Sequence, residues 1–426
     1  MAEPIPVQSP ANNVSPKAKS TAWLSIIRLI HGKGSDDQFL LGWIEACCSR
    51  PGTLVIGVVR MKAAQQIWGM VWVTVLCLLF PTQSIGAERT RVAFLNPGGP
   101  GDAFFKPMTD FMQAAADDLG FELTVYYANR NHVLYDENIH RLFSTQPLPE
   151  YIVGTNARGS GKELLKVAEA AGVKTLFVNQ GFIDVEQIVV GIPGERYKQW
   201  LFEYIPDDID AGYLLAKTLL DEAVEHSSDG TAEVLAITGH EESAASVLRL
   251  RGLKEALVEY PGVRLNQTVY ADWKRDKAKK LTRRLLERYP STSVIWSASD
   301  VMAHGVCEAV RETGRNPGSD VVVGGVDWAD SALDSLRRKE FTASVGGHFM
   351  DGGWALVMLY DMMHGIQPDK MGRSSFSVLT VDNVDIYAKL REQSWAAIDF
   401  RAFSKHLNPE LTQYNFGLEA VLKQLQ

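Results

Sequence analysis

Short apolar segments alternate with longer amphipathic segments from residue 91 onward, and this alternation limits the folds open to the chain. Residues 91–96 hold a short apolar run, residues 105–119 carry apolar side chains at helical spacing, and Gly120 follows them. Apolar strands separated by helices are typical of a parallel sheet that is covered on both faces. The same pattern predicts further strands at 121–127, 151–153, 175–179, 233–237, 267–270, 294–296 and 321–324, and further helices at 161–171, 209–225, 248–260, 275–289 and 302–313.

The alternation occurs in two successive runs, and the second run starts with the helical pattern near residue 209. We therefore expect an α/β fold of two lobes, each a doubly wound parallel sheet. The length of 426 residues is enough for two to three domains. No long Gly/Ser-rich stretch separates the two runs, so we expect chain crossovers and a hinge rather than a flexible linker.

Residues 61–87 show the three-part pattern of a secretory signal peptide. Lys62 is basic, residues 70–80 form an apolar run, and small residues end the segment at Ala87. A transmembrane helix needs about 20 apolar residues, so this run is short for a membrane span. The pattern predicts an exported protein.

A signal peptide normally follows a start codon, and this one begins at Met61. We therefore expect translation to start there, with residues 1–60 untranslated or forming a disordered extension. The mature chain would begin at Glu88. The alternative is a cytoplasmic tail that precedes a short membrane anchor.

Charge and cysteine content exclude several classes of protein. The net charge of −8 argues against nucleic acid as a partner. No two histidines are spaced as HxH or HxxxH, so we expect no metal ion and no cofactor. Zinc spacing and a CxxC motif are also missing from the cysteines, which are Cys47, Cys48, Cys77 and Cys307.

The segments that resemble catalytic motifs each lack a required residue. Residues 154–162 resemble a phosphate-binding loop, but Ser160 stands where the lysine must follow Gly159. Residues 240–244 are not HExxH, because Ala244 replaces the second histidine. No nucleophile, base and oxyanion set can be assembled, so the chain is predicted to bind a ligand rather than to be an enzyme.

In open parallel sheets, ligands bind beyond the carboxyl ends of the strands. Aromatic, Asp, Asn and Arg side chains follow the predicted strands, and this combination suits a sugar, whose C–H faces stack on rings while its hydroxyls bond to planar groups. Core packing is the alternative for the two Phe residues, and helix capping is the alternative for the Asp residues. The candidate ligand-binding residues are Phe104, Phe105, Asn179, Asp207, Arg249, Trp273, Ser299, Asp300, Asp327 and His348.

The chain resembles the periplasmic sugar-binding proteins of the ribose/galactose type, which have the type I periplasmic binding fold. The resemblance covers residues 90–395 and implies that both Phe residues, Arg249, Ser299 or Asp300, and Asp327 contact a sugar, with Trp273 stacking on it. It is carried by segments 102–105, 175–180, 207–212, 249–253, 299–303 and 323–327.

The resemblance also implies where the lobes begin and end. The first lobe would hold residues 88–205 and 348–368, the second 206–347 and 369–395, and a C-terminal tail would occupy 396–426. The sequence departs from the family at Asn179-Gln180, where an Asp-Arg pair is usual, at Ser299, where Asn is usual, and at residues 346–349. A modified sugar or a signal molecule is therefore a possible ligand.

The leading hypothesis is a monomeric periplasmic protein that captures a small polar, sugar-like ligand for an inner-membrane ABC-type importer. The alternative is a sensory binding protein that reports ligand occupancy to a membrane receptor such as a histidine kinase or a cyclase. An exported hydrolase would need a catalytic set. A DNA-binding repressor of the same fold would need a basic helix-turn-helix where the signal-like segment lies.

Overall fold

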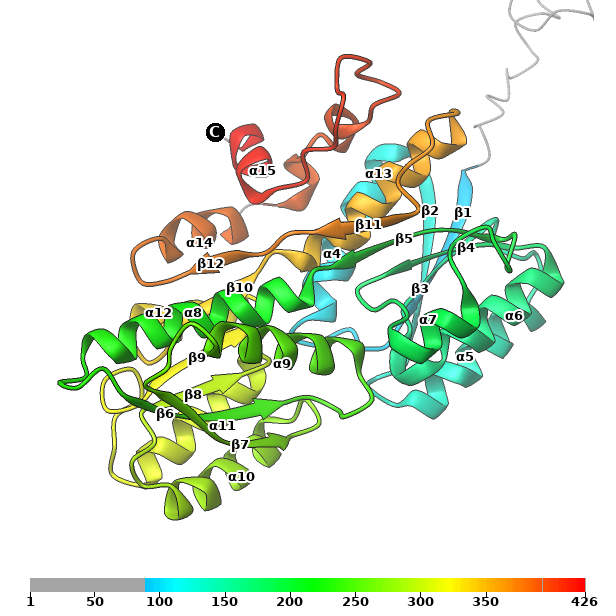
Figure 1. The fold of residues 1–426 in the computed structure, drawn as a ribbon. Coiled ribbons are helices and arrows are strands. Elements are labelled where there is room, and N and C mark those ends of the chain that lie inside the picture. The colour runs from blue at the N-terminus through cyan, green and yellow to red at the C-terminus, as the bar shows by residue number, and fades with distance from the viewer. Residues whose placement is uncertain (1–88, 393, 426) are drawn as a thin grey trace, which may run out of the picture. The chain divides into compact units, whose positions relative to one another are not determined.

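The computed structural model of the chain describes residues 89–392 and 394–425. The expected signal peptide at 61–87 and the expected extension at 1–60 lie outside the described residues. Two six-stranded sheets, each flanked by helices, form two lobes (Figure 1). Among the described residues, no helix is long and apolar enough to span a bilayer.

The first lobe is built on a sheet with the strand order β11-β5-β4-β3-β1-β2, and its strand pairs are parallel. Alternate residues of β1 face opposite sides, because Val92 and Phe94 pack in one hydrophobic cluster and Ala93 and Leu95 in another. The elements are β1 (Thr90–Asn96), α4 (Phe105–Leu119), β2 (Phe121–Tyr127), α5 (His132–Ser144), β3 (Tyr151–Gly154), α6 (Gly161–Ala171), β4 (Lys174–Val178), α7 (Asp184–Val190), β5 (Trp200–Pro206), α13 (Asp351–Met363) and β11 (Met371–Ser374).

The second lobe is built on a sheet with the strand order β12-β10-β9-β8-β6-β7. Its strands are parallel except for the edge strand β12, which pairs antiparallel with β10. The prediction of two lobes with parallel sheets is confirmed. The elements are α8 (Asp208–Glu225), β6 (Ala232–Thr238), α9 (Ala244–Leu257), β7 (Val263–Tyr270), α10 (Arg275–Arg288), β8 (Val294–Ser297), α11 (Asp300–Glu312), β9 (Val322–Val326), α12 (Asp330–Arg337), β10 (Ala343–Gly346), β12 (Ser377–Leu379) and α14 (Val384–Glu392).

The sequence did not reveal the strand β5. The buried side chain of Glu203 interrupts its apolar run, and this carboxylate pairs with Arg373 of β11 at 3.0 Å. A buried charge is tolerated in a strand only when a partner is supplied from elsewhere in the fold. That partner is 170 residues away in the chain, so no local pattern could predict the pairing.

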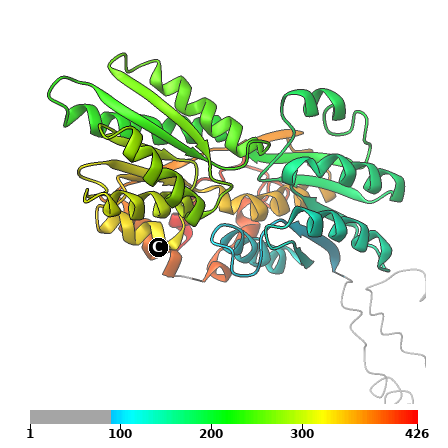
Figure 2. The ribbon, with the colours of Figure 1, turned by 90° about the horizontal axis from the view of Figure 1, so that it is seen from below.

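Three segments connect the lobes and form the hinge: between β5 and α8, between β10 and the short helix η2 (His348–Met350), and between β11 and β12. The lobes lie side by side when seen from below (Figure 2). Because β11 pairs with β5, residues 371–374 belong to the first sheet. The expected start of the second lobe's last segment at residue 369 is therefore corrected to a point after β11.

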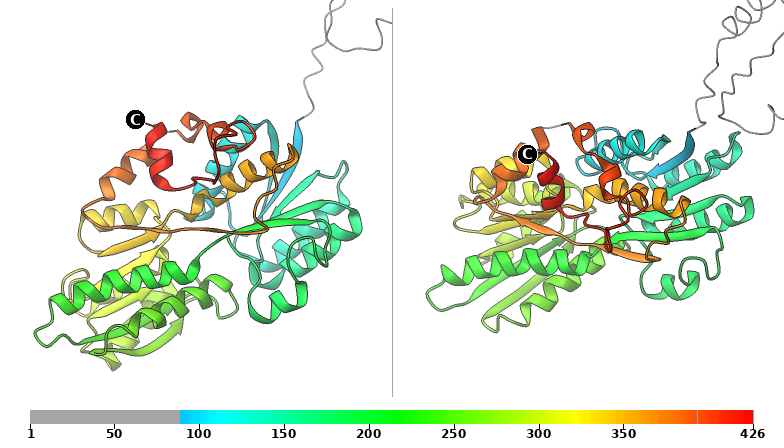
Figure 3. Two further views of the ribbon diagram at one scale, coloured as in Figure 1. Left: turned by 45° about the horizontal axis from the view of Figure 1, so that its top comes forward. Right: turned by 90° about the horizontal axis from the view of Figure 1, so that it is seen from above.

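The C-terminal residues beyond α14 extend this connection. Helix α14 belongs to the second lobe, where Arg391 pairs with Asp330 of α12 at 2.8 Å. The chain then packs on the first lobe through Trp395 and Phe400, whose rings lie 5.4 and 5.1 Å from that of Phe111 in α4. Figure 3 shows this segment lying against α4 and α13. The tail holds η3 (Trp395–Ala397), η4 (Phe400–Phe403) and α15 (Leu418–Gln424).

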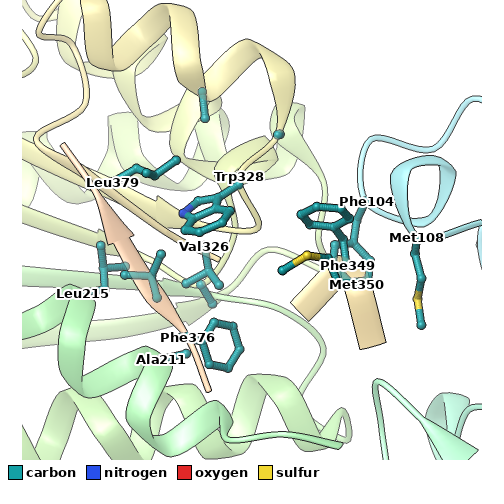
Figure 4. Close-up of a cluster of buried hydrophobic side chains, with 14 of the residues drawn as sticks. Phe104, Met108, Ala211, Leu215, Val326, Trp328, Phe349, Met350, Phe376 and Leu379 are labelled. Atoms are coloured by element: carbon teal, nitrogen blue, oxygen red, sulfur yellow. The ribbon is translucent and has the colours of Figure 1, made fainter. Parts of the chain in front are cut away.

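A cluster of buried apolar side chains draws residues from both lobes (Figure 4). Phe104 comes from the start of α4, Val326 from β9, and Phe376 from the connection between β11 and β12. The floor of the inter-lobe cleft is therefore continuous with the hydrophobic core. Its geometry is set by close packing rather than by loops.

Candidate functional site

A small cavity of about 50 Å³ lies in the cleft between the lobes, at the carboxyl ends of the parallel strands. All of the predicted site residues line it except Asp207 and Asp300. Its lining residues are Phe104, Phe105, Arg130, Asn179, Gln180, Ala245, Arg249, Trp273, Ser299, Val301, Asp327 and His348.

Arg249 organises the second-lobe side of the cavity. It is only 3% exposed, and its Nε donates to Asp208 Oδ1 at 2.7 Å. One terminal nitrogen donates to the carbonyl of Ala298 at 2.8 Å and to Asp327 Oδ1 at 3.3 Å, and the other lies 3.2 Å from His348 Nε2. A single buried guanidinium thus serves two carboxylates. Asp327 is therefore left with capacity to accept a bond from a ligand.

The close crossing of α8 and α9 brings Arg249 to Asp208. A Cβ atom on Gly212 of α8 would lie 1.9 Å from the carbonyl oxygen of Arg249, and one on Gly252 of α9 would lie 1.9 Å from that of Ile209. Only glycine permits backbones to approach so closely. The two glycines therefore place the guanidinium at the start of α8.

His348 lies deeper in the same network and is 1% exposed. Its ring stacks on Phe104 at 4.6 Å and packs against Phe376 at 4.7 Å. Burial, together with the charge of Arg249, lowers the pKa of His348 well below its usual value, so the imidazole is neutral. Because an arginine can only donate, Nε2 is the acceptor and Nδ1 carries the proton.

The protonation of Asp327 predicts a pH dependence of binding. Burial raises its pKa to about 6, although the charge of Arg249 opposes this shift. A ligand hydroxyl bonds more strongly to a carboxylate than to a carboxylic acid, so ligand affinity is expected to fall as the pH falls through about 6. Calorimetric titrations with a ligand of the cleft on either side of this pH measure the effect, and an Asp327→Asn variant is expected to lose it.

The contribution of Asp327 to the free energy of unfolding should change with pH in the opposite direction from ligand affinity. The folded-state pKa of about 6 lies above the usual value of about 3.9, so the folded chain holds the proton more tightly. This contribution to the free energy of unfolding is fully present below the usual pKa and is lost as the pH rises through about 6. An affinity that stays constant across this range would show that Asp327 does not accept from the ligand.

Arg130 provides the first-lobe side of the cavity, and sequence reasoning did not include it. Its guanidinium makes two hydrogen bonds to Asp102, at 2.6 and 2.8 Å, and lies 5.0 Å from the ring centre of Phe105. Burial alone would raise the pKa of Asp102, but the bond and charge of Arg130 outweigh it and lower that pKa. Arg130 follows the carboxyl end of β2, so the strand-end rule could have found it.

Trp273 stands at the opening of the cavity. It is half-buried, has a left-handed backbone with φ of 60°, and its ring lies over Gly239, where a Cβ atom would be 2.0 Å away. Arg249 lies 5.9 Å from its ring centre. The ring is thus held against the second lobe while part of it remains accessible to a ligand.

We expect Trp273→Ala to weaken ligand binding by about 1 kcal/mol or more, through loss of stacking, while the apo melting temperature changes little. Phe104→Ala should differ, because that ring is 7% exposed and packs on His348, so about 3–5 kcal/mol of stability is lost as well. Thermal melts and titrations of both variants test this. A destabilised Trp273→Ala with unchanged affinity would assign that ring to the core.

Asn179 and Ser299 reach the cavity from opposite lobes. Asn179 follows β4 with φ of 64°, is largely buried, and is followed by Gln180, which also lines the cavity. Ser299 caps α11, since its hydroxyl accepts from the amide of Met302 at 3.4 Å. Both residues therefore combine a local structural role with a position at the site.

Two of the predicted site residues are corrected by the structure. The carboxylate of Asp300 is fully buried and accepts from the hydroxyl of Ser344 and the amide of Ala329, each at 2.9 Å. Asp207 caps α8 by accepting from the amide of Asp210 at 3.2 Å. Both carboxylates lie outside the cavity lining. Asp207 is a helix cap, as its alternative stated, whereas Asp300 joins β10 to the residue before α12 and the cap of α11 is Ser299.

A wider space of about 410 Å³ opens in front of the small cavity and shares Phe105, Arg130 and Trp273 with it. Near this opening, Arg158 of the first lobe approaches Glu242 of the second to 4.0 Å, and both side chains are exposed. An exposed pair of this kind contributes little energy, so it does not hold the cleft shut. In the described part of the chain, no group of acidic, His or Cys side chains could hold a metal ion.

Comparison with known proteins gives consistent matches. Residues 92–366 match the model of the periplasmic binding protein domain family. A D-apiose import binding protein from Paraburkholderia graminis is 23% identical over 289 residues, which are 67% of this chain and 84% of that protein. The D-allose-binding periplasmic protein of Escherichia coli is 30% identical over 156 residues, which are 36% of this chain and 48% of that protein.

Solved structures match over a larger part of the chain. A periplasmic sugar-binding protein from Pseudomonas fluorescens superposes with a TM-score of 0.71 and 35% identity, covering 78% of this chain and 99% of that one. The arabinose-binding component of an ABC transporter from Shewanella superposes with a TM-score of 0.61 and 19% identity, covering 76% and 100%. At 19% identity, the similarity to the Shewanella protein is a similarity of fold.

Proposed function

Because the chain belongs to the periplasmic binding protein family, we propose that it captures a sugar or sugar-like molecule in the periplasm and delivers it to an ABC-type importer. The family is one of binding proteins, so the chain is a binding protein and not an enzyme. The observation that carries the proposal is the cavity between the lobes, where Phe104 and Trp273 offer ring faces and Asp327 and Arg130 offer charged groups. Rings and planar charged groups together match the faces and hydroxyls of a sugar.

Import is favoured over sensing. The relatives include proteins named for import of D-apiose and for binding of D-allose, and the arabinose-binding structure is a transporter component. A sensory role for this chain has no comparable support. The partner in this proposal is an inner-membrane permease, which the protein would meet as a monomer.

A thermal-shift screen against pentoses, hexoses, polyols and sugar acids tests the proposal. A true ligand present at 100 times its dissociation constant should add about 2.7 kcal/mol to the free energy of unfolding. Titration calorimetry then gives the affinity and stoichiometry for the compounds that shift the melt. If no compound of these classes stabilises a protein purified free of ligand, the proposed function is wrong.

We expect the exported protein to begin near Glu88, because residues 61–87 have the composition of a signal peptide. N-terminal sequencing of the protein recovered from the periplasm measures this. A variant with charged residues in the apolar segment 70–80 should remain in the cytoplasm. Recovery of a membrane-bound chain that still starts at Met1 would contradict both the processing and the location.

A further inference from the structure

A second cavity, of about 710 Å³, lies on the other side of the hinge from the ligand cleft. Its walls are α13, the connection between β11 and β12, and residues 405–418 of the C-terminal tail. It is far larger than the cleft cavity of about 50 Å³ and falls in the usual size range of small-molecule sites, about 300–1,000 Å³. Nothing in the function proposed above uses it.

The tail wall of this cavity is fixed to the first lobe by buried polar bonds. Asp361 of α13 accepts from the amides of Lys405 at 2.8 Å and His406 at 3.1 Å, and from the hydroxyl of Tyr414 at 2.9 Å. Its side chain is fully buried. A carboxylate that accepts this many hydrogen bonds holds the tail segment in one conformation. The wall of the cavity is therefore an ordered part of the fold.

Aromatic rings that are stacked on one another form the apolar part of the lining. The rings of Trp354 and Phe416 are stacked at 4.8 Å with an angle of 3°, and Tyr414 stacks on Phe416 at 4.7 Å. Trp354 is 1% exposed, and its indole N–H is enclosed by the surrounding protein rather than open to the cavity.

The polar part of the lining favours an uncharged ligand that carries hydroxyl groups. Asp351 is buried, and burial raises its pKa well above the usual value, so it readily takes up a proton. Its carboxyl accepts from the hydroxyl of Ser374 at 2.8 Å, and the hydroxyls of Ser375 and Ser377 also line the cavity. Arg373 is already paired with Glu203, and Asp369 and Lys405 carry opposite charges, so the lining selects neither sign of charge.

From the hydroxyl-rich wall, the aromatic rings beside it and the volume of about 710 Å³, we propose that this rear cavity is a second carbohydrate site, sized for a disaccharide. It is distinct from the cleft and does not depend on the function proposed for the cleft. Sugars suit it because their hydroxyls bond to short polar side chains while their C–H groups pack against the apolar side chains of the lining.

The rear cavity and the cleft share their dividing wall. Trp328 lines the rear cavity while its neighbour Asp327 lines the cleft, and Gly347 lines the rear cavity while its neighbour His348 lines the cleft. The ring of Trp328 packs on the Gly346 backbone, where a Cβ atom would lie 2.4 Å away. A ligand in the rear cavity would therefore contact the backbone that positions two cleft residues.

The test uses maltose, cellobiose and sucrose as probes, since the rear cavity has room for a disaccharide. Titration calorimetry on the full-length protein is expected to show binding of at least one probe. Binding should be lost in both Ser375→Trp and Thr412→Trp, which fill the rear cavity from different segments. It should persist in Trp273→Ala, which alters the cleft, and in Ser291→Trp, a matched control on an exposed turn of the second lobe.

Thermal melts establish that each variant is folded before titration. No binding of any of the three probes to the wild type would overturn the proposal. Binding that survives both filling substitutions, or that is lost in Trp273→Ala alone, would place the probe elsewhere and would also overturn it. Monosaccharide binding in the cleft is measured in a separate titration. The rear-cavity proposal and the function proposed for the cleft can therefore be contradicted independently.

Discussion

Replacing Arg249 by Met is expected to lower the free energy of unfolding by about 3–5 kcal/mol and to abolish ligand binding. The guanidinium is the shared partner of Asp208 and Asp327, and both carboxylates would be left buried without it. Burial already raises the pKa of each carboxyl group, so the unpaired charges would be removed only by protonation. Denaturant unfolding near neutral pH measures the loss, which should be smaller at acidic pH.

The matched control lies two residues along the same helix. Arg251 is exposed and pairs with Glu255 at 3.0 Å, so Arg251→Met removes a cation of the same size from the surface of α9. We expect its effect to stay within about 0.5 kcal/mol, with ligand affinity unchanged. Equal effects of the two substitutions would show that the buried network does not organise the second lobe.

Asp327→Ala should separate binding from stability. Arg249 keeps Asp208 as its partner at 2.7 Å, so the fold retains a paired guanidinium when Asp327 is removed. The ligand loses a charge-assisted bond of about 1.5–3 kcal/mol, which corresponds to roughly ten- to hundredfold in affinity. Calorimetry measures the affinity, and small-angle scattering measures whether ligand still draws the lobes together.

The expected closure follows from the geometry of the cleft. Phe104 and Arg130 belong to the first lobe, whereas Trp273 and Asp327 belong to the second, so a ligand that touches all four favours the closed form. Asp207→Ala is the control for Asp327→Ala. It removes a helix cap worth about 1 kcal/mol but no cleft group.

Two outcomes would contradict this account of the cleft. If Asp327→Ala binds and closes normally, the second-lobe part of the site is assigned wrongly. If the wild type does not compact with a sugar that demonstrably binds, closure about the hinge is not the mechanism.

Local patterns were sufficient for most elements that pack on an apolar face. Helices α4 and α6 and strand β2 have the predicted bounds. Their apolar residues recur at the spacing expected of a helix or a strand that buries only one face. Helix α5 was not predicted. It buries Tyr135, Ile139 and Leu142 on one face, but Asn138 is also buried there and donates to the carbonyl of Tyr127.

The rule that ligands bind beyond strand ends brought together residues that are far apart in the chain. It could not distinguish Asp327 from Asp300, because each is an aspartate that follows a strand of the same sheet. The distinction depends on Ser344 and Ala329, which supply hydrogen bonds to Asp300 and turn its carboxylate away from the cavity. Only the packing of β10 and α12 against α11 decides this.

The sequence by itself determined the two-lobe α/β architecture, because alternating apolar strands and amphipathic helices can bury their apolar surfaces in few other ways. It also determined that rings and charged groups gather where those strands end. The tertiary structure decided which of these groups face the ligand, since Arg249 draws its partners from α8, the turn after β9, and η2. It also decided that the tail packs behind the hinge and encloses a second cavity, because contacts such as those of Asp361 and Trp354 join segments that no local periodicity relates.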